Sequence, residues 1–407
     1  MADLNRKPRI AVVSHSFPTP EHPHRGHALY LHMQALRRYA DVEIYCVDPG
    51  YPSMRLLQPR TFPYASPKGT GSADQGHTRY VRYPALPLLS RPWNGASCAR
   101  QLLPLLAPEP PDLILGYFAY PAGEAAIRLG RRLGIPVIIG VLGSDVRIAR
   151  GWTKRAVRRV LQSATFVTGV SEELCQQAVS LGAHPDRIRA IHNGCDPTVF
   201  RPADRAEARV ELGIGPETAL VLFVGNLVPL KGLRELFEAM ALLVRRRPTI
   251  ELACIGEGPL DNELRSLAER DFPGSIRMLG VHPPHKVARW LAASNLLCLP
   301  SHSEGCPNVV IEALSAGRPV VASDVGGIPE LLDPASGVMI TPRDPVSLIR
   351  GIEIALDRNW DERVIAAKSN RSWQDVGRDT FAVCELVLSA ARQVGVAAVR
   401  KEFRIAM

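Results

Sequence analysis

Short apolar runs alternate along the chain with segments whose apolar residues recur at helical spacing. In the first half, seven runs have the length of a buried strand. They lie at residues 9–15, 42–47, 80–83, 112–116, 136–141, 165–170 and 187–191. In the second half, similar runs lie at residues 220–225, 250–255, 296–300, 320–323 and 337–341. This alternation predicts an α/β protein whose parallel sheets are covered by helices on both faces.

One segment between the two groups of strands has the composition of a hinge. Residues 191–202 contain Asn193 and Gly194, which suit a left-handed turn, together with two prolines. A chain of 407 residues also exceeds one ordinary domain of about 150 residues. We therefore expect one domain over residues 1–195 and a second over residues 196–374.

Basic residues are concentrated in the first half of the chain. Residues 1–170 contain 22 Lys and Arg against 10 Asp and Glu, and residues 171–407 contain 27 against 30. The two parts therefore carry net charges of +12 and −3, which indicates that the first meets an anionic membrane, a phosphorylated substrate or nucleic acid. Nucleic acid is not expected, because no aromatic residues interleave the basic ones and no helix-turn-helix or zinc-finger spacing is present.

The remaining composition favours a reduced, cytoplasmic globular protein. No apolar run reaches 18 residues, and the chain does not start like a signal peptide. The eight cysteines contain no C-x-x-C pair, so we expect reduced and mostly buried thiols, without a disulfide framework or a zinc site. The histidines near the N-terminus share no helical face, so we favour a solvated or substrate-facing loop over a metal site. They are His15, His22, His24, His27 and His32.

The stretch 296–331 carries the most specific chemistry. A buried strand ends near residue 300 and a helix begins near Pro307, so the loop between them faces the carboxyl edge of a sheet. Open α/β sheets bind ligands at that edge. Because Pro307 suits the first helical turn, the nearby free amides can bind a phosphate. These amides belong to Cys306, Asn308 and Val309.

Two carboxylates bracket this helix start. Glu304 lies in the loop and Glu312 in the helix, eight residues apart. Carboxylates do not bind phosphate, but they accept hydrogen bonds from the hydroxyls of a ribose and of a second sugar. A nucleotide diphospho-sugar supplies all of these groups.

The spacing Glu304-x7-Glu312, with Gly305, Pro307 and Asn308 between and SDVGGIPEL following, resembles the signature of family 4 glycosyltransferases. The resemblance implies the GT-B fold, two Rossmann-like domains facing a central cleft, with the first domain completed by the C-terminal helix 375–407. It implies retaining transfer of a hexose from a UDP- or GDP-sugar to a glycan, glycolipid or lipid-linked acceptor in cell-surface polysaccharide biosynthesis. No metal and no cofactor are expected.

The same resemblance assigns roles to residues of the second domain. Lys231 fits the second position of an Arg-x4-Lys pair that clamps the diphosphate, and Asn226 occupies the first. Gly256 lies in a Gly-x-Gly-Pro turn, and the backbone of Val281 borders the base. Glu304 would hold the reacting sugar and Glu312 the ribose. The catalytic group is thus expected to comprise Glu304, Lys231 and, from the first domain, Asp145.

The first domain matches the family less closely. Gly26 follows the first strand and lets the backbone approach a phosphate, although Arg25 stands where the family has a further glycine. Leu142 stands where the family often has a histidine. Asp145 suits either a hydrogen bond to an acceptor or sugar hydroxyl, or a helix N-cap. Residues 65–77, rich in Gly, Ser and Pro, are expected to form a surface loop bordering the acceptor.

A predicted helix over residues 147–162 carries many basic residues. Arg147, Arg150, Lys154 and Arg158 fall on one face. This face is either simply solvated or bound to an anionic membrane, which would place the protein at the inner face of the cytoplasmic membrane.

Two other functions agree with the same features. A nucleotide-sugar epimerase or a phosphorylase would share the two-domain architecture. A non-catalytic nucleotide-sugar-binding partner of a polysaccharide assembly complex would account for Asn226 and Leu142 at positions where the family has Arg and His.

Overall fold

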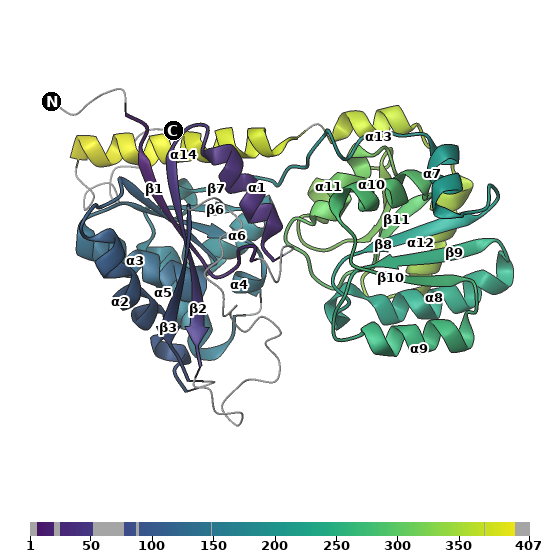
Figure 1. Cartoon of the computed structure of the whole chain (residues 1–407), viewed down its shortest axis with the longest axis horizontal. Coiled ribbons are helices and arrows are strands. Elements are labelled where there is room, and N and C mark those ends of the chain that lie inside the picture. The colour runs from purple at the N-terminus through teal and green to yellow at the C-terminus, as the bar shows by residue number, and fades with distance from the viewer. Residues whose placement is uncertain are drawn as a thin grey trace. The chain divides into compact units, whose positions relative to one another are not determined.

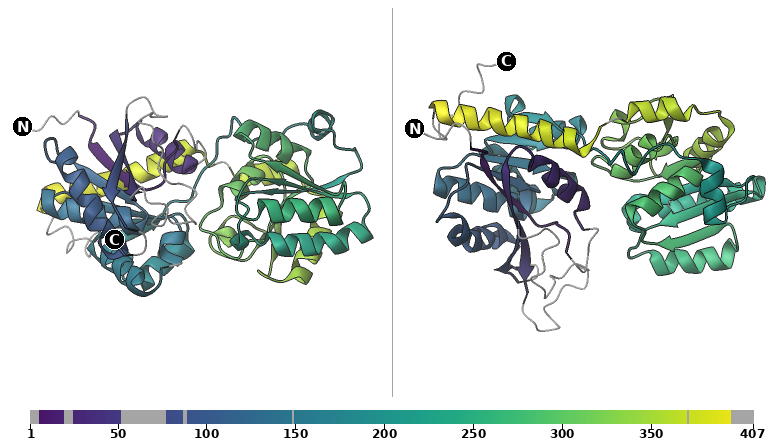
Figure 2. Two further views of the ribbon diagram at one scale, coloured as in Figure 1. Left: turned by 60° about the horizontal axis from the view of Figure 1, so that its bottom comes forward. Right: turned by 45° about the horizontal axis from the view of Figure 1, so that its top comes forward.

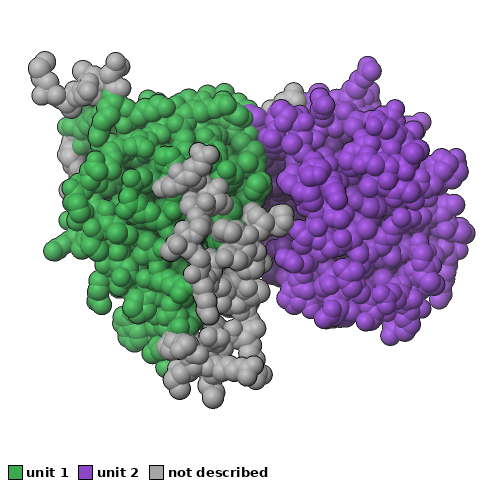
Figure 3. All heavy atoms as spheres, in the orientation of Figure 1, with its two compact units in different colours: residues 1–192, 373–407 green, residues 193–372 purple. Residues whose placement is uncertain are grey.

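The computed structural model describes the chain in six ranges, 6–19, 25–51, 77–86, 89–147, 149–369 and 371–394. The chain divides into two compact units (Figure 3). Unit 1 comprises residues 1–192 and 373–407, and unit 2 comprises residues 193–372. His22, His24, most of the predicted 65–77 loop and residues 395–407 lie outside the described residues.

A parallel sheet forms the centre of unit 1. Its strands, in spatial order, are β3 (Thr78–Pro84), β2 (Asp41–Gly50), β1 (Arg9–Ser14), β4 (Leu113–Tyr117), β5 (Val137–Val141), β6 (Phe166–Gly169) and β7 (Ile188–Ala190). Every residue of β4 and β5 is buried, as expected for central strands covered on both faces. β1 and β4 are adjacent, and from each of them the strands follow in sequence order toward one edge of the sheet.

Helices connect these strands and cover the sheet. They are α1 (His27–Leu36), η2 (Arg91–Trp93), α2 (Asn94–Leu106), η3 (Ala119–Gly123), α3 (Glu124–Leu133), α4 (Ser144–Arg147), α5 (Gly151–Ser163), α6 (Glu172–Ser180), η4 (Pro185–Arg187) and α14 (Trp373–Val394). α14 comes from the far end of the sequence and lies along unit 1 (Figures 1 and 2).

A second parallel sheet forms the centre of unit 2. Its strands, in spatial order, are β10 (Ile276–Gly280), β9 (Ile250–Ile255), β8 (Ala219–Val224), β11 (Leu296–Leu299), β12 (Val320–Ser323) and β13 (Gly337–Ile340). Here the order runs outward from β8 and β11. The predicted α/β architecture with two parallel sheets is therefore confirmed.

The helices of unit 2 lie on both faces of this sheet, with α8 and α9 on one side and α10 and α11 on the other (Figure 1). They are α7 (Arg205–Leu212), η5 (Pro229–Lys231), α8 (Leu233–Arg246), α9 (Asp261–Asp271), α10 (Pro284–Ala293), α11 (Asn308–Ser315), η6 (Ile328–Glu330), α12 (Pro345–Asp357) and α13 (Glu362–Lys368). Across the described ranges, no helix is both long and apolar enough to span a bilayer.

The packing of α14 on α1 depends on a glycine. A Cβ atom at Gly377 would lie 2.8 Å from both the carbonyl carbon and the Cβ of Ala35. Beside this contact, Met33 and Leu36 of α1 and Val383 of α14 join one hydrophobic core. The absence of a side chain at Gly377 therefore lets the two helices approach closely.

Two local predictions were wrong. Asn193 and Gly194 do not adopt a left-handed turn, since neither has a positive φ. The single helix predicted over residues 147–162 is two helices, α4 and α5, and the second begins at Gly151 with φ 54°. Arg147 therefore lies on a separate element and forms an ion pair with Glu173. It does not belong to the basic face of α5.

We predict that Gly377→Ala destabilises unit 1. On an exposed helix this change would raise the free energy of unfolding by about 0.5–1 kcal/mol, because alanine is the better helix former. Here the added methyl group collides with α1, and overpacking costs about 1–3 kcal/mol. Thermal unfolding should show a lower midpoint for Gly377→Ala. The control Ala382→Gly, on the exposed face of α14, measures the effect of helix propensity alone. A midpoint raised by Gly377→Ala would contradict the close approach.

Candidate functional site

The sheet of unit 2 reverses its strand order between β8 and β11. In open α/β sheets, ligands bind beyond the carboxyl ends of the two strands at such a reversal. Two loops start there, residues 225–232 after β8 and residues 300–307 after β11. The first contains Asn226 and Lys231, and the second contains Glu304, Gly305, Cys306 and Pro307, all of which the sequence singled out.

Backbone contacts hold these two loops together. A Cβ atom at Gly232 would lie 2.0 Å from the carbonyl oxygen of Pro300, and Gly232 has φ 67°. Only glycine fits both the contact and the conformation. The amide of His302 also donates to the carbonyl oxygen of Leu230 at 2.8 Å. The loops are thus fixed by their backbones, whatever their side chains bind.

Lys231 and Glu304 come together where these loops meet. The Lys231 Nζ atom donates to Glu304 Oε1 at 2.5 Å, and the hydroxyl of Ser301 donates to the same oxygen at 2.6 Å. The side chains of Lys231 and Glu304 are 22% and 9% exposed, so the pair is shielded from bulk water without being sealed off. An accessible ammonium group that is held in place can bind an anion.

Glycine backbones also shape the loops after β8 and β9. A Cβ atom at Gly256 would lie 1.9 Å from the carbonyl oxygen of Gly225, so the two chains touch through their backbones. Asn226 is exposed beside this contact. Val281, at the end of the neighbouring strand β10, is 40% exposed. This arrangement leaves Asn226 and Val281 accessible at the same edge of the sheet.

The start of α11 faces this edge as well. Pro307 is the N-cap residue, and the first backbone hydrogen bond of the helix runs from Val310 N to Pro307 O at 3.1 Å. Among the described residues, no acceptor is found for the amides of Asn308 and Val309. Free amides at a helix start attract anions, and the helix dipole adds to that attraction.

Asn193 holds the loop that precedes α11, a role that sequence reasoning missed. Its side-chain amide donates to the carbonyl oxygen of Cys306 at 3.1 Å and to Asn308 Oδ1 at 2.8 Å. Gly305 is fixed in turn by a hydrogen bond from Gly327 N at 2.8 Å. The sequence did mark Asn193, as a turn residue, but the pairing depends on a contact across more than 100 positions.

Glu312 lies half-buried in α11. Within the described ranges, no hydrogen bond or ion pair is found for its carboxyl group, and burial raises the pKa of Glu312 from 4.5 to about 7. The same carboxyl group raises the pKa of Cys195 electrostatically, after the larger effect of burial. The oxygens of Glu312 are therefore available to accept hydrogen bonds, and the group lies close to Cys195.

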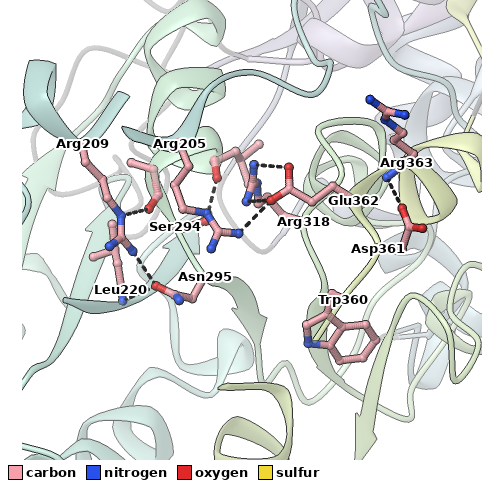
Figure 4. Close-up of polar contacts among 12 residues, drawn as sticks. Arg205, Arg209, Leu220, Ser294, Asn295, Arg318, Trp360, Asp361, Glu362 and Arg363 are labelled. Carbon is pink, nitrogen blue, oxygen red and sulfur yellow. Dashed lines mark hydrogen bonds and ion pairs between the residues drawn. The ribbon is translucent and has the colours of Figure 1, made fainter. Parts of the chain in front are cut away.

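An ion pair lies just beyond the C-terminal end of α11. Arg318 is fully buried, and its guanidinium group donates to both oxygens of Glu362 at 2.7 and 2.9 Å. Arg205 donates to the same carboxylate at 2.9 Å (Figure 4). Burial lowers the pKa of Arg318 to about 10, so it remains charged at neutral pH. Removing Glu362 would leave the buried Arg318 cation without its partner, which destabilises the fold. Because the Glu362 side chain is 36% exposed, the cost is lower than for a fully buried pair.

Unit 1 contains the remaining predicted residues. Gly26 has φ 63° and precedes α1, and a Cβ atom there would lie 2.5 Å from the carbonyl oxygen of Ser16. Asp145 does not cap a helix, because its carboxylate accepts from the amides of Leu142, Gly143 and Ala119. It thereby links the loops after β4 and β5.

Within the described residues, the histidines and cysteines form no shared metal site. His32 is bonded within unit 1 to Thr380 at 2.7 Å, whereas His15 lies against Phe118. In the part of the chain that the structure describes, no group of three or more His, Cys, Asp or Glu side chains could hold a metal ion. All eight cysteines are buried, as predicted.

The exposed face of α5 carries four basic side chains. Lys154, Arg155, Arg158 and Arg159 are exposed, and the opposite face of the helix is buried. The described residues contain no ion-pair partner for these four. Of the four residues predicted to share one face, Lys154 and Arg158 lie on α5, whereas Arg150 precedes this helix and Arg147 lies on α4.

Sequence comparison matches both units to families of known proteins. Residues 27–199 match the family model described as Glycosyltransferase Family 4, and residues 218–358 match that described as Glycosyl transferases group 1. A Bacillus subtilis (strain 168) protein named for teichuronic acid biosynthesis, the glycosyltransferase TuaC, is 33% identical over 60% of this chain and 60% of its own length. D-inositol 3-phosphate glycosyltransferase of Segniliparus rotundus is 33% identical over 54% of this chain and 53% of its own length. The chain thus spans little more than half of these relatives.

Solved structures share the fold. Anabaena Alr3699/HepE, crystallised in complex with UDP-glucose, superposes with a TM-score of 0.69 at 18% identity, over 95% of this chain and 100% of that chain. Sucrose-phosphate synthase from Thermosynechococcus elongatus gives a TM-score of 0.69 at 19% identity, over 96% and 100%.

We predict that Glu312 makes stability depend on pH. Because its pKa is raised on folding, the folded chain holds a proton that the unfolded chain releases, and the free energy of unfolding falls as pH rises from about 4.5 to about 7. The loss is at most about 3 kcal/mol. Urea unfolding at pH 5 and pH 8 should show that Glu312→Gln is the less pH-sensitive protein. Equal pH dependence in both proteins would contradict a buried, protonated carboxyl group.

Proposed function

Because this chain belongs to glycosyltransferase family 4, which has the GT-B fold, we propose that it transfers a hexosyl group from a nucleotide diphospho-sugar to a hydroxyl acceptor with retention of configuration. The observation that carries the proposal is the Lys231–Glu304 pair beside the start of α11, at the reversal of strand order in unit 2. A cation, free amides and carboxylates at one sheet edge suit the phosphates and hydroxyls of such a donor.

Each of these residues binds a different part of the donor. The diphosphate lies at Lys231 and at the amides of Asn308 and Val309, which neutralise the charge that builds on the leaving phosphate. Glu304 accepts hydrogen bonds from the hydroxyls of the transferred sugar. Glu312 accepts them from the ribose. Donor binding therefore replaces part of the Lys231–Glu304 contact by contacts to the substrate.

The remaining donor contacts are supplied by the loops. The exposed amide of Asn226 donates to a phosphate oxygen at the position where other members have a cation. The backbone beside Gly256 and Val281 borders the base of the UDP or GDP group. Gly305, Cys306 and Pro307 hold the helix start in place.

Transfer breaks the bond between the anomeric carbon and the phosphate oxygen and forms a bond from that carbon to the acceptor oxygen. The leaving phosphate takes the acceptor proton, so no side chain is needed as general base. The name of the Bacillus subtilis relative, which refers to teichuronic acid biosynthesis, supports an acceptor of the polysaccharide class. A lipid-linked glycan at the inner face of the cytoplasmic membrane would suit the basic face of α5.

We predict different losses from the two carboxylates. Glu312→Ala should weaken binding of plain UDP or GDP by about 2 kcal/mol, because a ribose contact is lost in a buried site. Glu304→Ala should leave that affinity nearly unchanged and lower the rate of sugar transfer or donor hydrolysis. Calorimetry with the nucleoside diphosphate, and mass spectrometry of a panel of nucleotide sugars, measure the two effects.

Glu269→Ala, an exposed change on α9, serves as the matched control and should alter neither quantity. Equal loss of nucleotide affinity in the Glu304 and Glu312 variants refutes the division of roles. A wild-type protein that binds nucleotide yet consumes no sugar donor supports the non-catalytic partner. One that interconverts two nucleotide sugars without an acceptor supports the epimerase.

We predict salt-sensitive binding to anionic membranes through α5. Each basic residue near an anionic surface contributes about 1 kcal/mol, so the four exposed cations suffice for reversible recruitment. The attraction acts over a Debye length of about 8 Å at physiological salt. Co-sedimentation with phosphatidylglycerol vesicles should exceed that with phosphatidylcholine vesicles and fall as salt is raised.

Replacing Lys154, Arg155, Arg158 and Arg159 by Gln should abolish this preference. The matched control replaces four exposed arginines of unit 2 by Gln, Arg234, Arg245, Arg246 and Arg270, and should keep it. If both four-residue variants behave alike, only net charge matters and α5 is a solvated face.

A further inference from the structure

His302 links the loop after β11 to the helix that follows the loop after β8. Its Nε2 atom lies 2.7 Å from Oε1 of Glu235, in the first turn of α8. Because a carboxylate oxygen only accepts hydrogen bonds, the imidazole nitrogen is the donor. The side chains of His302 and Glu235 are 14% and 23% exposed, so water competes little for this hydrogen bond. It joins the same two parts of the chain as the contact between Lys231 and Glu304.

Glu235 is a well-fixed partner for His302. Two residues before it, Leu233 is fully buried in unit 2, and close packing of this kind holds the start of α8 in place. The neighbouring Arg234 does not draw the Glu235 carboxylate away, because its guanidinium group donates to both oxygens of Glu263, at 2.8 and 2.9 Å. The His302 side chain is thus held by a packed helix rather than by another loop.

The backbone of His302 is fixed as well as its side chain. Its amide donates to the carbonyl oxygen of Leu230 at 2.8 Å, in the loop after β8. Glu304 follows only two positions later, and the hydroxyl of Ser301 donates to Glu304 Oε1 at 2.6 Å. His302 therefore lies within the short segment, residues 301–304, that sets the position of the Glu304 carboxylate.

The proposed reaction needs a link between these parts that the donor does not break. Donor binding replaces part of the contact between Lys231 and Glu304, whereas neither His302 nor Glu235 is assigned a contact to the donor. The Lys231 ammonium group lies on a long flexible stem and can follow the phosphate, but the Glu304 carboxylate depends on its loop. A displacement of about 1 Å in a positioned group can lower a rate about 100-fold. Loss of the His302–Glu235 hydrogen bond should therefore affect Glu304 first.

We propose that His302 and Glu235 are positioning residues, whose hydrogen bond holds Glu304 where it meets the hydroxyls of the transferred sugar. The nucleotide part of the donor does not depend on this bond, because the loop before α11 is held separately by Asn193, which donates to the carbonyl oxygen of Cys306. The bond therefore acts on the sugar-bearing donor and not on plain nucleotide. The inference rests on the proposed function, in which Glu304 binds the sugar and the start of α11 binds the diphosphate.

Variants of the full chain that alter this one hydrogen bond test the proposal. His302→Leu removes the donor, so the rate of nucleotide-sugar consumption, followed by mass spectrometry, should fall about tenfold or more. Affinity for UDP or GDP, measured by calorimetry, should be nearly unchanged. His302→Gln keeps an N–H donor at a similar reach and should restore most of the rate. Glu235→Leu added to His302→Leu should lower the rate no further, because both changes remove the same bond.

Arg277→Leu is the matched control. It breaks an ion pair with Glu251 at the amino ends of β10 and β9, away from these loops, and should alter neither quantity. A wild-type rate in His302→Leu overturns the proposal, as does an equal loss in His302→Gln or a matching loss of nucleotide affinity. If the wild type binds UDP but consumes no donor, the affinity for UDP-glucose relative to UDP replaces the rate and should fall in His302→Leu. A wild-type protein that binds neither nucleotide counts against the proposed function instead.

Discussion

The contact between Gly232 and the carbonyl oxygen of Pro300 is the constraint on which the site in unit 2 depends. No side chain fits between the two backbones, where a Cβ atom would be only 2.0 Å from the oxygen. The loops after β8 and β11 therefore meet directly, and Lys231 and Glu304 meet with them. Gly256 and Gly225 repeat the arrangement at the neighbouring loop, with a separation of 1.9 Å for the missing Cβ. Charged groups held by fixed backbones need little reorganisation when a substrate arrives, which is the basis of electrostatic preorganisation.

The two units place side chains at equivalent positions of their sheets, but these side chains differ in charge. Each sheet reverses its strand order once, and each reversal carries a pair of side chains at the carboxyl edge. In unit 2 the pair is an ammonium and a carboxylate beside a helix start, which suits an anionic ligand. In unit 1 it is the neutral imidazole of His15 and the phenyl ring of Phe118, neither of which carries a charge. This contrast agrees with the proposed transfer from a charged donor to a hydroxyl acceptor.

Contacts between distant parts of the chain changed three interpretations. Asp145 suited a cap or a substrate hydroxyl from its local sequence, yet its carboxylate holds the amide of Ala119, 26 positions away. Arg147 looked like part of one basic face, but Gly151 starts a new helix and Arg147 pairs with Glu173. Asn193 looked like a turn residue, and its amide holds the loop before α11 instead. In each case the local sequence allowed several roles for the side chain, and a contact with a residue far away in the sequence decided among them.

The sequence alone determined the α/β class and the number of sheets, because buried parallel strands are continuous apolar runs. It also located the candidate site in the loops at one sheet edge, since the carboxyl ends of parallel strands share that edge. It also marked Lys231, Glu304 and Glu312 through a resemblance at fixed spacing. Only the tertiary structure decided which side chains touch. The 2.5 Å contact of Lys231 with Glu304, the raised pKa of Glu312 and the pairing of His15 with Phe118 follow from strand order, backbone contact and burial. Those are properties of residues far apart in the chain, and no local pattern of apolar and polar positions encodes them.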